Sequence, residues 1–383
     1  MHNLYDKSRS RERMRMIELM PVARQFRLLK SEILAKISNT IEEGKYILGP
    51  QVKQLESRIA EWTGARHAVA VANGTDALVL TLDACGIGPG DEVITTPYTF
   101  FATSEAISRV GAIPVFVDID RFWNLDAEQV EQAITSRTKA ILPVHLFGQP
   151  ARMDAIREIA DRRGLLVIED ACQAFGARFV GKPVGTLGKA GCFSFFPTKN
   201  LGTLGDGGLI VTSDAALADR VRELRQHGSS KRYYHDAIGY NSRLDELHAA
   251  VLLVMLEKID EWNEKRRKTA QIYEERLAPL RPFIELPVTE DGRLHAYNVY
   301  CVTSPHRDFL REELLARNIQ TGIYYPRPLH LQRAYHSLGY KPGDFPVAER
   351  LSAEALALPI GPLLTEQEQN QIVSALRDVA ERM

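Results

Sequence analysis

Cysteine, long apolar runs and excess charge are all scarce in this chain, and each scarcity excludes a class of protein. The 383 residues include four cysteines, which lie far apart and form no Cys-x-x-Cys pair. Neither a zinc site nor a secreted disulfide framework is therefore expected. No apolar run approaches the roughly 20 residues that a membrane-spanning helix requires, and the first residues are charged rather than signal-like. We expect a cytoplasmic protein without a bound metal.

The charge balance argues against partners that need a basic surface. Lys and Arg number 48 and Asp and Glu 49, so the net charge is -1. The chain offers no general positive field for nucleic acid or an anionic membrane. Four arginines do recur near the start, at Arg9, Arg11, Arg13 and Arg15. They leave open an RNA- or membrane-binding arm, but a disordered extension over residues 1–21 is favoured because compact patterning begins only after them.

Short apolar segments alternate with amphipathic ones along most of the chain. This alternation is typical of βαβ units around a mainly parallel sheet. Val52, Leu55, Ile59 and Trp62 recur at helical spacing before Gly64, which predicts a helix that ends at that glycine. Seven segments are predicted as strands: Ala68–Ala72, Glu92–Thr96, Pro114–Val117, Ala140–Val144, Leu165–Ile168, Gly191–Phe195 and Leu209–Val211.

The chain is long enough for one large core and a smaller one, so we expect two domains. Residues 245–280 indicate one or two long helices, with an apolar stripe of Leu247, Ala250, Val251 and Val254. After residue 282 the pattern changes to an α+β mixture, with a strand near 299–302 and helices near 309–317 and from 366 onward. We place the boundary near residue 262, between a large domain (22–262) and a small C-terminal domain (263–383).

Three segments carry residues from which a pyridoxal phosphate pocket can be built. Asp170 follows a strand that should be buried, at the end where open α/β sheets bind ligands, and a carboxylate there suits a protonated pyridine nitrogen. Lys199 follows an apolar strand that Pro197 ends, and a lysine in an enclosed pocket loses its proton readily and becomes a nucleophile. Gly74 and Thr75 lie between a strand and a helix, where backbone N–H groups can hold a phosphate.

Each of these residues also has an ordinary structural interpretation. Asp170 could cap a helix, and most lysines lie at the surface; their combined surroundings favour the pocket. Gln173 would face the same side as Asp170 if a helical turn begins there, and could donate to the phenolate oxygen of the cofactor. Ser194 could donate to the phosphate and Phe100 could lie flat on the pyridine ring, although an isolated serine or aromatic residue more often belongs to the core.

Six motifs, in order, closely resemble those of the DegT/DnrJ-type sugar-nucleotide aminotransferases. They are Ala72–Leu78, Gly88–Ile94, Pro143–Gln149, Ile168–Ala174, the segment around Lys199, and Gly239–Asp245. The resemblance runs from about Val22 to the end of the chain. It implies a fold-type-I architecture like that of aspartate aminotransferase, and a homodimer with its active sites at the subunit interface.

The resemblance also implies a role for each matching residue. Lys199 would form the Schiff base with pyridoxal phosphate and move protons, with Asp170 at the ring nitrogen and Gln173 at the phenolate oxygen. Asn241 would reach the phosphate from the neighbouring subunit. Gly74, Thr75 and Ser194 would bind the phosphate, and Phe100 would stack on the ring.

The implied activity is transfer of an amino group from glutamate, through pyridoxamine phosphate, to a nucleotide-linked keto sugar in amino-sugar biosynthesis. Residues 228–235 and 239–247 look more like the members that aminate a 3-keto hexose, linked to dTDP or UDP, than like the 4-amino group. Arg243 would meet a carboxylate or a diphosphate, or simply pair with Asp245. Tyr324, Tyr325 and His330 would form a substrate lid, or only pack a loop.

Three other functions fit parts of the sequence. A dehydratase of this fold would carry histidine where this chain has Lys199. A cofactor-binding regulator without turnover stays open, although retention of the whole catalytic set argues against it. A nucleotide-binding Rossmann protein would need a glycine fingerprint after the first strand, and Ala72–Thr75 lacks one.

Overall fold

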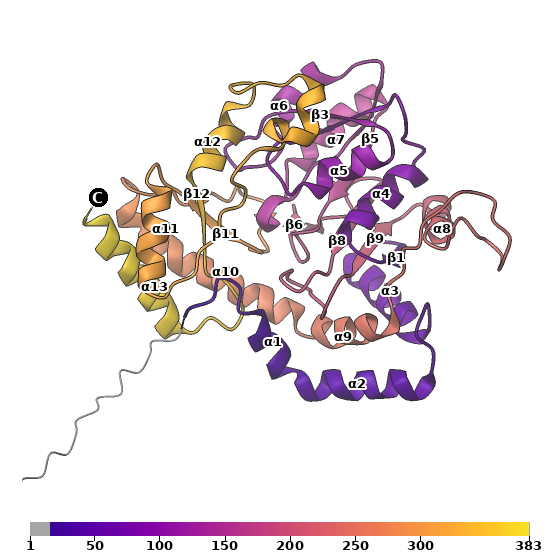
Figure 1. Ribbon diagram of the computed structural model, residues 1–383, viewed down its shortest axis with the longest axis horizontal. Helices are drawn as coiled ribbons and strands as arrows, with labels where there is room; N and C mark the ends of the chain where they lie inside the picture. The colour runs from indigo at the N-terminus through magenta and orange to yellow at the C-terminus, as the bar shows by residue number, and fades with distance from the viewer. Residues whose placement is uncertain (1–15, 383) are drawn as a thin grey trace, which may run out of the picture.

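The computed structural model describes residues 16–382 and is built around a seven-stranded sheet (Figure 1). Its strands are β1 (His67–Val71), β2 (Glu92–Thr95), β3 (Ile113–Phe116), β4 (Thr138–Ile141), β5 (Leu166–Asp170), β8 (Ala190–Ser194) and β9 (Gly208–Thr212). In space the order is β1-β9-β8-β5-β4-β2-β3. The five strands from β8 to β3 are parallel, whereas β9 is antiparallel to both of its neighbours. The predicted α/β fold with a mainly parallel sheet, and all seven strand segments, are confirmed.

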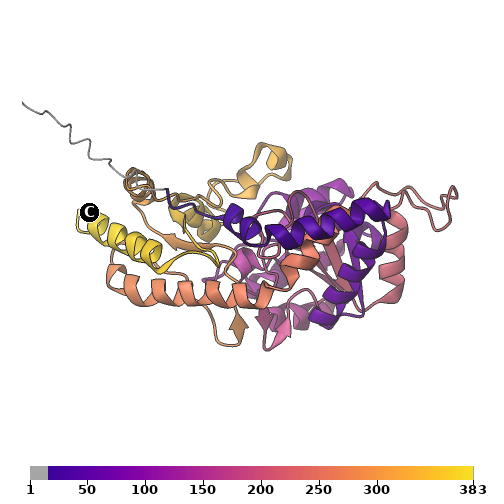
Figure 2. The same cartoon turned by 90° about the horizontal axis from the view of Figure 1, so that it is seen from below.

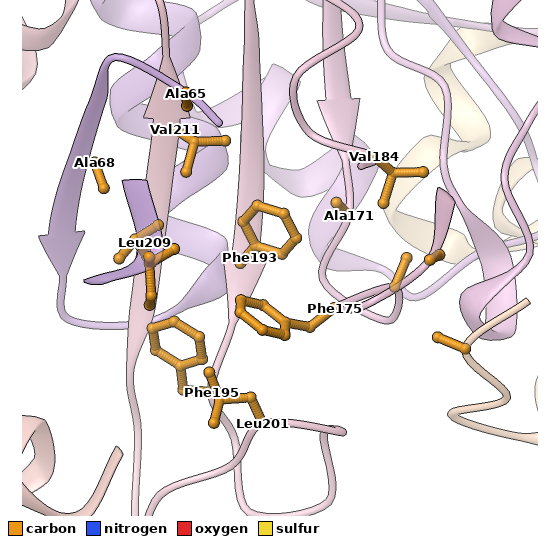
Figure 3. Close-up of a cluster of buried hydrophobic side chains, with 14 of the residues drawn as sticks. Ala65, Ala68, Ala171, Phe175, Val184, Phe193, Phe195, Leu201, Leu209 and Val211 are labelled. Carbon is orange, nitrogen blue, oxygen red and sulfur yellow. The ribbon is translucent and has the colours of Figure 1, made fainter. Parts of the chain in front are cut away.

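The sheet is buried on both faces. Along β9, Leu209 and Val211 belong to one buried cluster and Ile210 to another, as the two-residue period of a strand requires. Figure 3 shows part of the first cluster, in which Phe175, Phe193 and other side chains pack together. Burial on both faces is the physical reason that these strands are nearly continuous apolar runs.

Helices cover each of the two faces. The first cluster includes residues of α2 (Lys30–Glu43), α3 (Pro50–Thr63) and α7 (Met153–Arg163), and the second includes residues of α4 (Gly74–Ala84), α5 (Ala102–Arg109) and α8 (Ala215–Leu224). The short helices α1 (Val22–Leu28) and α6 (Ala127–Val130) complete this part. The predicted end of α3 is confirmed, since Gly64 follows it with a φ of 76°. Over residues 16–382, no helix has the length and apolar character needed to cross a bilayer.

Two consecutive helices, α9 (Glu246–Leu256) and α10 (Ile259–Leu277), form the helical region predicted after residue 245. The predicted stripe on α9 is wrong in detail. Leu247 is exposed and Val254 only half-buried, whereas Leu252 and Leu253 are buried. The reason is that α9 contacts both α2 and α3, so it is apolar on nearly all sides rather than along one face.

The remaining elements, at the left of Figure 1, enclose a second, smaller cluster of buried side chains. It contains β11 (Tyr300–Thr303), β12 (Ala355–Leu358), α11 (Arg307–Ala316) and α13 (Glu366–Ala380), and α12 (Pro346–Glu354) lies nearby. The short strands β6 (Arg178–Phe179), β7 (Lys182–Pro183) and β10 (Arg293–Leu294) form a separate sheet. The predicted strand near 299 and the helices near 309 and from 366 are confirmed.

Helix α10 joins the two cores. Its first turn contributes Ile259 and Trp262 to the large cluster, and its second half contributes Tyr273 and Leu277 to the small one. We therefore propose that the domains divide within α10, near residue 262. Ile17 is also buried in the small cluster, while residues 1–15, with their four arginines, lie outside the described residues.

Candidate functional site

A cavity of about 530 Å³ opens beside the carboxyl ends of β5 and β8, whose last residues, Asp170 and Ser194, lie in its wall. This is the edge at which parallel sheets bind ligands. Nine predicted site residues line the cavity: Gly74, Thr75, Phe100, Asp170, Gln173, Ser194, Lys199, Tyr324 and Tyr325. Segments far apart in the sequence thus meet at one place.

One side of the cavity is formed by the N-terminus of α4. The helix begins at Gly74, so Gly74 and Thr75 belong to its first turn rather than preceding it. Asn73 caps the helix by accepting a hydrogen bond at 2.8 Å from the backbone N–H of Asp76. A Cβ atom on Gly74 would lie 2.6 Å from the Cβ of Ser194, so only glycine lets the helix start approach the serine hydroxyl this closely. The N–H groups of the first turn, the helix dipole and that hydroxyl make a cradle suited to a phosphate.

Asp170 supplies a buried carboxylate, 5% exposed. One of its oxygens, Oδ2, accepts a hydrogen bond at 2.7 Å from the hydroxyl of Thr103, and the other accepts one at 3.2 Å from the backbone N–H of Cys172. The residues that follow Asp170 form turns rather than the expected helical turn, yet Gln173 still lines the same cavity. The two hydrogen bonds fix both oxygens of Asp170.

Gln173 is held in one orientation by its neighbours. Its Oε1 accepts a hydrogen bond at 2.8 Å from the backbone N–H of Phe147, a residue with a φ of 57°. Its Nε2 therefore becomes the donor end and donates at 3.0 Å to the hydroxyl of Tyr325. The second N–H of this amide is left to donate to an oxygen of a bound ligand.

Lys199 lies in the turn after β8, where its backbone N–H donates to the carbonyl of Phe196 at 2.8 Å. Its side chain is half-buried at the cavity wall. Desolvation lowers the pKa of this amine, and the nearby Cys172 and Asp170 only partly oppose the shift. The amine therefore loses its proton more readily than a surface lysine, as a nucleophile requires.

These groups fit pyridoxal phosphate one by one. The Gly74–Ser194 cradle suits the phosphate, Asp170 the ring nitrogen, the free N–H of Gln173 the ring oxygen, and the Lys199 amine the aldehyde. All four come from one chain and face one cavity.

The burial of Lys199 predicts that the stability of the protein without cofactor depends on pH. Because folding lowers this pKa, the unfolded chain binds more protons than the folded one between the lowered value and the ordinary lysine pKa of about 10.4. The free energy of unfolding therefore rises with pH across that window. Lys199→Met should make the apoprotein more stable than wild type at neutral pH, and the gain should shrink as the pH approaches about 10.4.

Thermal melts of both apoproteins at several pH values measure this effect, with Lys182→Met as the matched control, since Lys182 is exposed. A gain in stability that stays constant with pH would show that Lys199 is not the titrating group.

Three predicted residues lie outside the cavity. Asn241 is exposed and Arg243 half-buried, and both follow the loop that extends from the body between α8 and α9, at the right of Figure 2. His330 is 1% exposed and pairs with Glu349 at 3.1 Å. Its ring packs edge-on against Phe345 and Tyr340, and it does not line the cavity.

The lining residues that were not predicted from the sequence include Thr99 and Thr103. The only signal in the sequence was that Thr99 and Thr103 are four residues apart, around the start of α5. Nothing in that spacing indicates which way the hydroxyls point.

Comparison with known proteins gives one consistent result. The model of the DegT/DnrJ/EryC1/StrS aminotransferase family matches residues 27–377. A pleiotropic regulatory protein of Geobacillus stearothermophilus is 49% identical over 94% of this chain and 98% of the relative. The UDP-N-acetyl-3-dehydro-alpha-D-glucosamine 3-aminotransferase of Acidithiobacillus ferrooxidans is 44% identical over 94% of this chain and 97% of the relative. The crystal structure of S. venezuelae DesV in complex with a ketimine intermediate superposes with a TM-score of 0.94, at 44% identity, covering 96% of this chain and all of that one.

Proposed function

The chain belongs to the DegT/DnrJ/EryC1/StrS aminotransferase family, and we propose that it uses pyridoxal phosphate to carry an amino group from glutamate to a 3-keto hexose linked to dTDP or UDP. It is a sugar-nucleotide aminotransferase. The observation that carries the proposal is the meeting, in one cavity, of an amine with a lowered pKa, a buried carboxylate and a phosphate cradle.

Each residue of the cavity has a defined task in this reaction. The bound cofactor supplies an aldehyde that takes up the amine and a ring that accepts electrons from the reacting carbon. With the cofactor bound, the Lys199 amine would hold it and would move the proton between the donor carbon and the neighbouring carbon of the cofactor. Asp170 keeps the ring nitrogen charged, and Gln173 Nε2 donates to the ring oxygen. Phe100 lines the cavity, is 56% exposed and would cover the ring face.

The carbon that receives nitrogen is assigned by similarity. The Acidithiobacillus relative is named for amination at the 3-position of a UDP-linked sugar, and residues 228–235 and 239–247 of this chain look like those of 3-aminating members. Tyr324 and Tyr325 line the cavity and supply hydroxyls for the hexose. The alternative acceptor is a 4-keto sugar, which requires only that the hexose sit differently in the same cavity.

A regulatory role without turnover is the second candidate, because the Geobacillus relative is named a regulatory protein. It predicts cofactor binding without amino transfer. The complete set of Lys199, Asp170 and Gln173 in one cavity favours the enzyme.

The test is a panel of matched 3-keto and 4-keto hexoses, each linked to dTDP or UDP, incubated with the holoenzyme and glutamate. We expect glutamate-dependent amination at C-3, read by mass spectrometry and by NMR of the product, and none with Lys199→Ala. Amination at C-4 would overturn the assignment of the carbon. Bound cofactor without transfer to any acceptor would favour the regulator.

The charge of the cavity supports a homodimer with shared sites. The described residues that line it include one basic group, Lys199, and two acids, Asp170 and Asp206. The cofactor phosphate, the donor carboxylates and the nucleotide diphosphate are all anions that need positive charge or donors nearby. A second copy of the chain is the proposed source, through Asn241 at the phosphate and Arg243 at the sugar nucleotide.

Exposed apolar side chains support the same assembly. Leu34 and Ile41 on α2 are 53% and 57% exposed, and they are seven residues apart, on one face of that helix. The loop between α8 and α9 carries Tyr233 and Ile238, which are 79% and 96% exposed, together with basic residues. Large apolar groups left open in this way are typical of a surface that a partner covers.

A further inference from the structure

Two buried threonine hydroxyls form a line that ends at the carboxylate of Asp170. The Thr103 hydroxyl lies 2.7 Å from Asp170 Oδ2, and the Thr99 hydroxyl lies 3.1 Å from that of Thr103. The two residues are 1% and 2% exposed. Thr99 precedes α5 and Thr103 lies in its first turn, and both line the cavity.

The direction of these hydrogen bonds follows from the number of protons available. An ionised carboxylate can only accept, so Thr103 must donate its single hydroxyl proton to Asp170. Having donated its proton to Asp170, Thr103 can only accept a hydrogen bond from Thr99. Thr99 therefore donates its hydroxyl proton to Thr103. Hydrogen bonds that point the same way polarise and strengthen one another in a buried setting.

We propose that Thr103, supported by Thr99, is a positioning residue that aims the Asp170 carboxylate at the cofactor ring nitrogen and strengthens its hold there. This inference rests on the proposed function and deepens it. With Oδ2 tied to Thr103 and Oδ1 to the backbone N–H of Cys172, the carboxylate plane cannot rotate freely. One lone-pair direction on each oxygen remains for the ring N–H.

Loss of the Thr103 hydroxyl has two separable consequences. The negative form of Asp170 loses a donor, so it holds the proton on the ring nitrogen less well and cofactor affinity falls. The ring then carries less positive charge. Because the ring is conjugated to the Lys199 nitrogen, the Lys199 nitrogen keeps its proton to higher pH. The other titratable groups near Asp170, which the substitution leaves in place, are Cys172, Cys192 and Tyr325.

The experiment compares Thr103→Val, Thr103→Ser and Thr99→Val with wild type, each prepared without cofactor and titrated with pyridoxal phosphate. Thr103→Val should raise the dissociation constant about tenfold, the factor expected for one lost hydrogen bond to a charged group. It should also move the midpoint of the pH titration of the bound cofactor's absorbance upward. Thr103→Ser should behave like wild type, and Thr99→Val should change both readouts in the same direction by less.

Thr95→Val is the matched control. Its hydroxyl is buried and donates at 2.8 Å to the carbonyl of Leu142, so it should lower thermal stability without moving either cofactor readout. Wild-type affinity and an unmoved titration midpoint in Thr103→Val would overturn the inference, as would a Thr99→Val variant identical to wild type. Failure of the wild-type protein itself to bind pyridoxal phosphate would instead overturn the proposed function.

Discussion

Replacing Lys199 with alanine is expected to reduce kcat by about 10⁴-fold or more, because one group supplies both the covalent attachment and the proton transfer. Its position supports this size of effect. Lys199 is the one basic residue among the described residues lining the cavity, and burial lowers its pKa. The loss should appear in each half of the reaction, since each moves a proton at the reacting carbon. Single-turnover mixing with glutamate, and separately with the keto sugar, measures the two halves.

The control for this variant is Lys182→Ala, which removes an exposed lysine remote from the cavity and should leave kcat unchanged. Lys199→Ala should still bind the cofactor through its phosphate, with weaker affinity, because the Gly74–Ser194 cradle is intact. Turnover within tenfold of wild type would show that another residue does the work assigned to Lys199.

Two inactive variants, Lys199→Ala and Asn241→Asp, should restore activity when they are co-expressed. Asn241→Asp places a negative charge where the neighbouring subunit's phosphate is proposed to bind, so it should be nearly inactive alone. In a mixed dimer, one site then receives both native residues and the other receives both substitutions. Random pairing makes about half of the dimers mixed, so the expected recovery is about a quarter of wild-type activity per subunit.

The matched negative control is co-expression of Lys199→Ala with Asp170→Asn. These residues line one cavity of one chain, so no mixed dimer holds an intact site and no activity should return. If Asn241 instead acted on the site of its own chain, its pairing with Lys199→Ala would also stay inactive. Two tags, purified in sequence, confirm that the mixed dimers form.

The parts of the fold that were predictable are those set by local patterning. Seven strands buried on both faces appear in the sequence as short apolar runs. Gly64 marks the end of α3 because its φ of 76° favours glycine. The buried residues of α9 were mispredicted because its two neighbours, α2 and α3, come from the distant start of the chain. Periodicity reports one buried face, and it cannot report a helix that is covered on several sides.

In the candidate site, too, features set by local patterning were predictable and features set by distant contacts were not. The positions of Asp170, Ser194 and Lys199 follow from strand ends, which the sequence indicates. The orientation of Gln173 does not, because it depends on the backbone N–H of Phe147, in a turn with positive φ, and on the hydroxyl of Tyr325 more than 150 residues away. The contact of Thr103 with Asp170 joins α5 to β5 and likewise depends on how the strands are ordered in space.

Peptide mapping of the holoenzyme after borohydride reduction shows whether the amine of Lys199 carries the cofactor. Reduction makes the bond between lysine and pyridoxal phosphate permanent, so the modified residue can be read by tandem mass spectrometry. We predict a phosphopyridoxyl group on the peptide that contains Lys199 and on no other. Modification of a different lysine, or an unmodified Lys199 in protein that retains the cofactor, would show that Lys199 does not carry it.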